Sequence, residues 1–143
     1  MKRTMLSLLI GTASFFSMGQ IAVTGISPAS IQGNYNFDLA ESTQSWAPAL
    51  NFNTPGVFVQ DTLVFVEDGT TGNNPQGNPL SQEGCNALTN ASAVNGKIAV
   101  IYRNTCDFGL KAINAQNAGA VAVIIVNRDP EVVGMNGGTN GLN

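Results

Sequence analysis

Residues 96–127 read GKIAVIYRNTCDFGLKAINAQNAGAVAVIIVN and combine two short apolar runs with a segment of small residues between them. The runs at residues 98–102 and 121–126 are almost unbroken, which is typical of strands buried on both faces, as parallel strands usually are. Parallel strands require a crossover connection, and the segment between the runs is long enough for one helix. The stretch therefore predicts a β-α-β unit within a mixed α/β fold.

The predicted helix covers residues 108–118. Asp107 precedes it and can accept hydrogen bonds from the amides of the first turn, and Gly119 follows it, where a left-handed residue often ends a helix. One side of this helix carries small residues and is expected to approach the sheet closely. Four residues form that side: Phe108, Ala112, Ala115 and Gly119. Leu110 and Ile113 point elsewhere, either beneath another part of the same domain or against a partner domain.

Several residues of this stretch occur at the same spacing as the residues of a known sequence signature. They are Gly96-Lys97-Ile98-Ala99, Arg103, Cys106-Asp107-Phe108, Lys111 and Asn117-Ala118-Gly119-Ala120. Together they resemble the signature of the protease-associated (PA) domain, and the resemblance is continuous over roughly residues 84–138. Asn104 departs from it, because the family usually has glycine there. If that position requires a positive φ, asparagine is the least costly replacement.

The resemblance implies an open β-barrel or sandwich with a β-α-β unit and a flanking helix, a mixed α+β architecture. Such domains are inserted in, or attached to, secreted peptidases and other surface proteins, and they are not themselves catalytic. In the family another strand usually follows the glycine-rich stretch that begins near residue 134, and this sequence lacks it. We therefore expect a domain that is incomplete at its C-terminus, either a fragment of a larger protein or a truncated gene product.

Residues 1–19 read as a secretory signal peptide. Lys2 and Arg3 precede an apolar stretch, and small residues stand just before Gln20. The alternative is an uncleaved membrane anchor, although the apolar run is shorter than a membrane span requires. We divide the remainder into an N-terminal β segment at residues 20–56 and the PA core at residues 57–143. The predicted location is secreted, either extracellular or at the cell surface.

Two further strands are predicted before the PA signature. Residues 31–39 alternate between apolar and polar side chains, which predicts a half-buried strand. Residues 57–66 form another β-rich run after a turn. In this second run, four residues share the parity of one face: Val57, Val59, Leu63 and Phe65.

The two cysteines, Cys85 and Cys106, stand on either side of the first core strand. A chain that leaves one end of the sheet and returns can bring them together, and export favours oxidation, so we predict a disulfide. The alternative is two unpaired, partly buried thiols.

A polar segment between residues 68 and 84 is rich in glycine, asparagine, proline, threonine and glutamine. It predicts a long exposed loop, and functional residues are often found on such loops. The candidate ligand residues are Asp68, Thr70, Asn73, Asn74, Gln76, Asn78 and Gln82. An ordinary flexible connection is the equally simple interpretation.

Composition excludes several classes of chemistry. The sequence contains no histidine, which removes Ser-His-Asp and Cys-His catalysis and histidine-based zinc sites. After signal removal, four basic residues face nine acidic ones, which argues against nucleic acid and against electrostatic binding to anionic membranes. No cofactor is expected, although the oxygen-rich segment at residues 68–73 leaves a calcium ion as a minor alternative.

The leading hypothesis is a non-catalytic accessory module that binds protein or peptide segments, or that positions a catalytic domain of the same polypeptide. The first alternative is the accessory region of a secreted metallopeptidase or serine peptidase whose catalytic domain lies beyond this chain. The second is a surface adhesin or carbohydrate-binding protein, suggested by the loops rich in asparagine, threonine and glycine. Arg103 and Lys111 are expected to make structural contacts.

Overall fold

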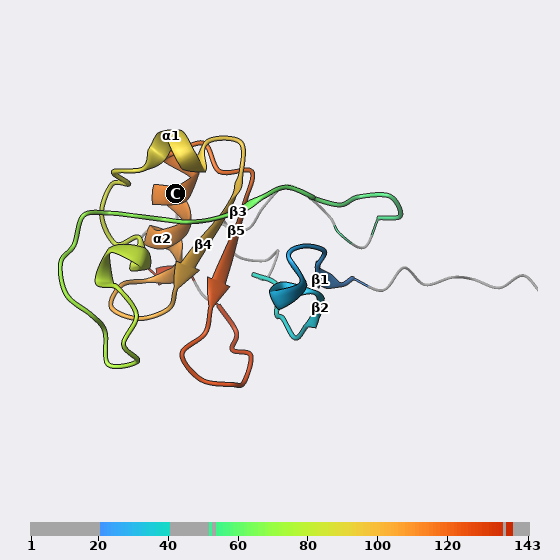
Figure 1. Ribbon diagram of the computed structural model, residues 1–143, viewed down its shortest axis with the longest axis horizontal. Coiled ribbons are helices and arrows are strands. Elements are labelled where there is room, and N and C mark those ends of the chain that lie inside the picture. Colours follow the sequence, from blue (N-terminus) through green and yellow to red (C-terminus); the bar gives the residue numbers. More distant parts are fainter. Residues whose placement is uncertain (1–20, 41–51, 53, 136, 139–143) are drawn as a thin grey trace, which may run out of the picture.

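The computed structural model of the chain describes residues 21–40, 52, 54–135 and 137–138. Its main element is a three-stranded parallel sheet in the order β3-β4-β5, with helices α1 and α2 packed against one face. A two-stranded antiparallel sheet, β1-β2, lies to one side (Figure 1). The predicted mixed α/β fold is confirmed, and the described residues form no closed barrel. The signal peptide predicted at residues 1–19 lies outside the described part.

The predicted β-α-β unit is present. Strand β4 (Ile98–Tyr102) pairs in parallel with β5 (Ala122–Val126), and helix α2 (Phe108–Asn117) connects them. Strand β4 is buried from Ile98 to Ile101, as predicted, whereas β5 is half-buried and Val126 is exposed. Burial on both faces was therefore wrong for β5. This strand lies at the edge of the sheet and has a neighbour on one side only.

Helix α2 ends as the sequence predicts but begins differently. Gly119 has a φ of +84°, its N–H donates to the Gln116 carbonyl at 2.9 Å, and Ala120 N–H donates to the Ala115 carbonyl at 3.0 Å. These bonds satisfy carbonyls of the last turn. Asp107 occupies the N-cap position without a side-chain capping bond, so that part of the prediction was wrong. Its carboxylate instead fills the space where a side chain on Gly138 would lie.

The buried side of α2 differs from the predicted one. The buried residues of α2 are Gly109, Lys111 and Ala115, and Ala118 at its C-cap is buried as well. Lys111, Ala115 and Ala118 follow one another at the helical spacing of four and three residues. Of the four residues predicted for this side, Ala115 is buried, whereas Phe108, Ala112 and Gly119 are half-buried. The pattern of apolar and small residues predicted the wrong side of the helix, because the fold buries the charged Lys111.

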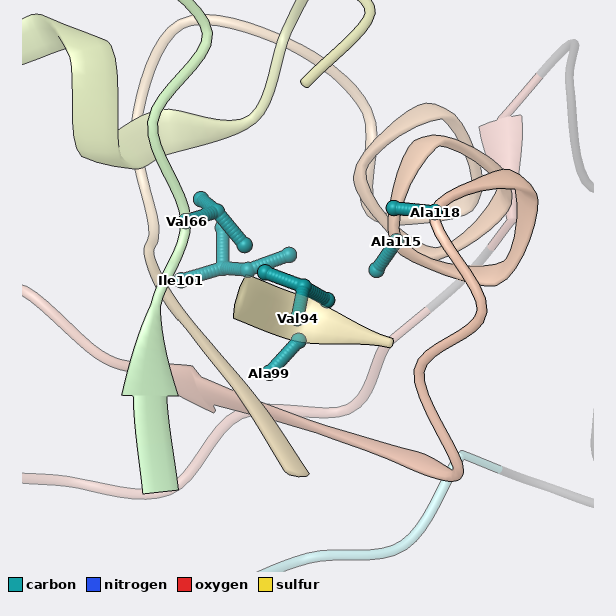
Figure 2. Packing of buried hydrophobic residues seen from close by; sticks show 6 residues of the cluster. All are labelled: Val66, Val94, Ala99, Ile101, Ala115 and Ala118. Carbon is teal, nitrogen blue, oxygen red and sulfur yellow. The ribbon is translucent and has the colours of Figure 1, made fainter. Parts of the chain in front are cut away.

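The apolar core lies between the sheet and the helices (Figure 2). Val94 of α1 (Ala91–Val94) lies between the sheet and the two alanines of α2, whose small side chains allow close approach. The buried members of this core are Val66, Val94, Ala99, Ile101, Ala115 and Ala118. The short 3-10 helix η2 (Leu80–Glu83) lies in the connection between β3 and α1.

Strand β3 (Leu63–Phe65) is shorter than the predicted run, and Leu63 and Phe65 lie on one face of it, as predicted. Its parallel register pairs Leu63 with Ile98 and Phe65 with Val100, so these two β3 residues point away from the helices. They are 44% and 41% exposed, whereas Val66 is fully buried. The sequence does not indicate which face the helices cover, because residues 63–66 are all apolar and a shift of one residue exchanges the two faces.

The predicted half-buried strand at residues 31–39 was also wrong. The structure places η1 (Ala29–Ile31) and then β2 (Gly33–Tyr35) there, and β2 pairs with β1 (Val23–Gly25). All three residues of β2 are exposed, and among the described residues this sheet has two strands. Among the described residues, no helix has the length and apolar character needed to cross a membrane.

The end of α2 gives a testable prediction. Replacing Gly119 with alanine should lower the free energy of unfolding by about 1–2 kcal/mol or more, because a Cβ at a left-handed position is strained and would overlap the Asn95 side chain. Urea unfolding measures the change. Gly134→Ala is the matched control, since open space surrounds Gly134 and its φ lies outside the left-handed region. Equal stability of the two variants would contradict the argument.

Candidate functional site

The polar segment that leaves β3 does not lie wholly on the surface. Asp68, Asn74 and Glu83 are buried, and each of them has hydrogen-bond partners within the fold. The prediction of an exposed loop was therefore wrong for these residues. Polar side chains can be buried when other groups replace their bonds to water, and here the partners come from distant parts of the chain.

Glu83 anchors the end of η2 under the turn between β4 and α2. One carboxylate oxygen accepts a hydrogen bond from the Asn74 side-chain amide at 3.1 Å. The other accepts from the Thr105 backbone N–H at 3.1 Å and from its hydroxyl at 2.7 Å. Burial raises the pKa of Glu83, but the bonds from Thr105 and Asn74 outweigh it and hold the pKa below its ordinary value. Glu83 therefore remains a buried carboxylate.

Lys111 of α2 is completely buried beside it. Its ammonium donates to the backbone carbonyl of Glu83 at 2.6 Å and lies 3.7 Å from the sulfur of Cys85. Burial lowers the pKa of Lys111 to about 8, and the charges of Glu83 and Asp68 limit that fall. The long side chain thus reaches from the helix to the loop, which agrees with the structural contact expected for it.

Asp68 holds the other end of the segment. One carboxylate oxygen accepts from the backbone N–H groups of Cys85 at 2.9 Å and Asn86 at 3.1 Å, and the other accepts from Thr70 N–H at 2.9 Å. A calcium ion at residues 68–73 would have to compete with these donors. Within the described ranges, no group of three or more acidic, cysteine or histidine side chains is placed to hold a metal ion.

The predicted disulfide between Cys85 and Cys106 is present in the structure, with a Cα–Cα distance of 5.8 Å. It joins the polar segment to the turn that precedes α2, close to Lys111 and Glu83. We call Asp68, Asn74, Glu83 and Lys111 the buried polar cluster. Their spacing along the sequence offered no signal for this cluster.

The other candidate ligand residues do not converge on one point. Thr70, Asn73 and Gln76 are exposed, whereas Asn78 and Gln82 are half-buried. Gln82 donates to the Glu67 carboxylate at 2.8 Å, and Asn78 N–H donates to the Asn74 side chain at 2.9 Å. These contacts order the segment. A ligand role for its exposed residues stays a prediction.

The motif residues hold the two ends of the β-α-β unit. Gly96 has a φ of +72° and its N–H donates to the Gly119 carbonyl at 2.9 Å, so the two glycine turns lie against each other. Lys97 forms a 2.8 Å ion pair with Asp61. At the opposite end, Arg103 donates to the Asn127 side chain at 2.8 Å and lies over the ring of Phe108.

Asn104, where the sequence departs from the family pattern, does not adopt a positive φ. Its side chain instead donates to Gln76 at 3.1 Å and accepts a long bond from Arg128 at 3.4 Å. The asparagine therefore links the polar segment to the strand ends, a contact that glycine cannot make.

Sequence reasoning missed an exposed apolar surface. The face of the three-stranded sheet that points away from the helices carries the exposed Leu63, Phe65 and Val126 and the half-buried Tyr102, and we call these four residues the exposed sheet face. Between them, Ile98 and Val100 of β4 point to the same side and are buried. The rings of Phe65 and Tyr102 stack with centroids 5.2 Å apart. Exposure could not be predicted here, because both faces of these strands are apolar.

Comparisons with known proteins agree with this architecture. The family model described as PA domain matches residues 59–143, more than half of the chain. The chain belongs to the PA domain family. The match includes the β-α-β unit, the buried polar cluster and both cysteines of the disulfide.

Curated relatives match this PA domain over shorter stretches. The human ER degradation-enhancing alpha-mannosidase-like protein 3 is 56% identical over 43 residues, and its Xenopus laevis counterpart is 46% identical over 43 residues. These stretches are 30% of this chain and 5% of each relative. An aminopeptidase of Pseudomonas aeruginosa is 50% identical over 48 residues, 34% of this chain and 9% of the relative. The chain thus spans a small part of these relatives. No solved structure shows a significant match.

The buried lysine gives a prediction about pH. Between pH 8 and about 10.5, Lys111 binds its proton in the unfolded chain but not in the fold, so the free energy of unfolding should rise with pH in this window. The rise should be on the order of 3 kcal/mol. Urea unfolding across this window measures it. Lys111→Met should abolish the rise and Lys97→Met should keep it. A flat or falling profile in the unaltered protein would contradict the buried, depressed lysine.

Proposed function

We propose that this PA domain is a non-catalytic module that binds extended protein or peptide segments for a larger secreted or cell-surface protein, or that positions a catalytic domain of the same polypeptide. The observation that carries the proposal is the exposed sheet face. An apolar surface of stacked aromatic and aliphatic side chains is costly to leave in water and suits contact with another polypeptide.

The relatives support an accessory role. Their names describe two different activities, an aminopeptidase and an alpha-mannosidase-like protein, and only a small part of each resembles this chain. A module found with unrelated chemistries is more simply explained by recognition or positioning than by catalysis. The absence of histidine from the sequence agrees with this interpretation.

The contact proposed for the exposed sheet face is apolar rather than electrostatic. Leu63 and Phe65 contribute aliphatic and aromatic area at the edge strand β3, and Val126 extends that area on β5. The chain carries a net charge of −3, so it has no strong field to attract a charged partner. Binding should therefore depend on apolar side chains of the partner and change little with salt.

A peptidase context is the second candidate, favoured by the similarity to the Pseudomonas aeruginosa aminopeptidase. In that case the bound segment is substrate that the module presents to a catalytic domain outside this chain. Secretion fits both candidates, because the disulfide suits an oxidising compartment. Calcium binding at residues 68–73 and glycan binding by the polar segment are subsidiary proposals, and direct titration with calcium and a glycan array test them.

Peptide binding tests the proposal. Fluorescent peptides tiled from reduced casein serve as unfolded probes, and fluorescence anisotropy measures their affinity. We expect binding by the unaltered protein that weakens about tenfold or more in a Leu63→Ser/Phe65→Ser variant, because removing two apolar contacts costs at least about 1.4 kcal/mol. Salt should have little effect.

A second variant separates the two surfaces. Thr70→Ala/Gln76→Ala alters exposed residues of the polar segment and leaves the exposed sheet face intact. Affinity lost in this variant alone would assign recognition to the polar segment. Circular dichroism of both variants checks the fold. No binding of any tiled peptide by the unaltered protein would reject peptide recognition and leave the positioning of a catalytic domain.

A further inference from the structure

The disulfide has unequal surroundings at its two sulfurs. The Lys111 ammonium lies 3.7 Å from the sulfur of Cys85, inside the fold, and its position is fixed by the 2.6 Å bond to the Glu83 carbonyl. Within the described part of the chain, no hydrogen bond or ion pair joins a cation to Cys106. Cys85 and Cys106 are both half-buried and both have an exposed neighbour in sequence, so the Lys111 contact is the feature that distinguishes the two sulfurs.

This difference determines how the bond would break. In thiol–disulfide exchange the attacking thiolate bonds to one sulfur, and the other sulfur leaves as a thiolate. The sulfur with the lower thiol pKa leaves faster, and a neighbouring cation lowers that pKa. The Lys111 contact therefore favours departure of Cys85 and attack at Cys106.

We propose that Cys85–Cys106 is a thiol-exchange site for a dithiol reductant, in which the reductant bonds to Cys106 and Cys85 is released as a thiolate beside Lys111. The first thiolate of the reductant forms a new S–S bond with Cys106 as the Cys85–Cys106 bond breaks. Its second thiol then displaces Cys106, which leaves as a thiolate and takes up a proton. The dithiol is thereby oxidised to a disulfide, and its two electrons reduce the two cysteines.

The surroundings keep the released Cys85 in place. Asn114 of α2 donates to the Gly84 carbonyl at 2.9 Å, and Asp68 accepts from the Cys85 backbone N–H. These bonds do not involve the disulfide, so the thiolate stays near Lys111. Asp68 and Glu83 are the acidic groups that face this site, and both accept hydrogen bonds that partly neutralise their charge. Lys111 contacts the sulfur itself and has the larger influence on it.

Trapping of the mixed disulfide tests the direction of attack. The unaltered protein is incubated with reduced glutathione, quenched with acid and analysed by peptide mass spectrometry. Glutathione should be found on Cys106, in excess over Cys85 by about tenfold. Equal labelling, labelling mainly on Cys85, or no mixed disulfide at any glutathione concentration would overturn the proposal. This experiment needs no variant and therefore does not depend on a substitution being tolerated.

Reduction kinetics test the role of the lysine. At pH 7, where Lys111 with its pKa of about 8 carries its proton, dithiothreitol should reduce the disulfide of Lys111→Met about tenfold more slowly than that of the unaltered protein, because Cys85 then leaves without a cation beside it. Lys97→Met, which removes a lysine that precedes β4 and pairs with Asp61, should react at the unaltered rate. Circular dichroism establishes that each variant is folded. An equal or faster rate in folded Lys111→Met would refute the role assigned to Lys111.

Alkylation provides a readout that does not require Lys111 to be replaced. In a Cys106→Ser variant, the pH dependence of the reaction of Cys85 with iodoacetamide reports the pKa of its thiol. Half-maximal reactivity should lie below the ordinary thiol pKa of about 8.5. Half-maximal reactivity at or above that value, in a protein that circular dichroism shows to be folded, would count against the proposal.

Discussion

The bonds of Lys111 form the constraint on which the rest of the domain depends. A lysine ammonium withdrawn from water must find acceptors inside the protein, and here it finds the Glu83 carbonyl and the edge of the disulfide. The lysine belongs to the helix of the β-α-β unit, whereas its partners belong to the segment between β3 and α1. Neither part can bury its polar groups alone. Helix α2 and the polar segment must therefore fold together, and the disulfide joins the same two regions.

The position of this cluster also explains why the two faces of the sheet differ. Helices α1 and α2 and the polar segment gather on one face, where Val66 and Ile101 are fully buried. On the opposite face Leu63 and Phe65 remain accessible, although they are as apolar as the residues of the core. The side of the sheet with the helices is thus covered, whereas the opposite side keeps accessible apolar side chains on β3 around the buried Ile98 and Val100 of β4. Accessible apolar area of this kind is costly to leave in water.

Much of the β-α-β unit could be predicted from the sequence, because its signals are local. The apolar run of β4, the stop at Gly119 and the parallel pairing follow from residue type and spacing. The features that could not be predicted depend on contacts between residues far apart in the sequence. The sequence leaves open which side of β3 faces the helices, because residues 63–66 are all apolar, and the register with β4 decides it. The strand predicted at residues 31–39 has the right alternation, but the strand there spans only Gly33–Tyr35 and is exposed. Burial of Lys111 and Glu83 depends on contacts across 28 residues.

The same long-range contacts show why the polar segment was hard to interpret. Its composition is that of a flexible loop, and the exposed Thr70, Asn73 and Gln76 agree with that. Its ends, however, are fixed by Asp68 and Glu83, whose carboxylates accept backbone N–H groups from residues 17 to 22 positions away. The anchored ends preserve the fold, whereas the exposed middle has few contacts to lose. Substitutions in the middle should therefore be tolerated better than substitutions of Asp68 or Glu83.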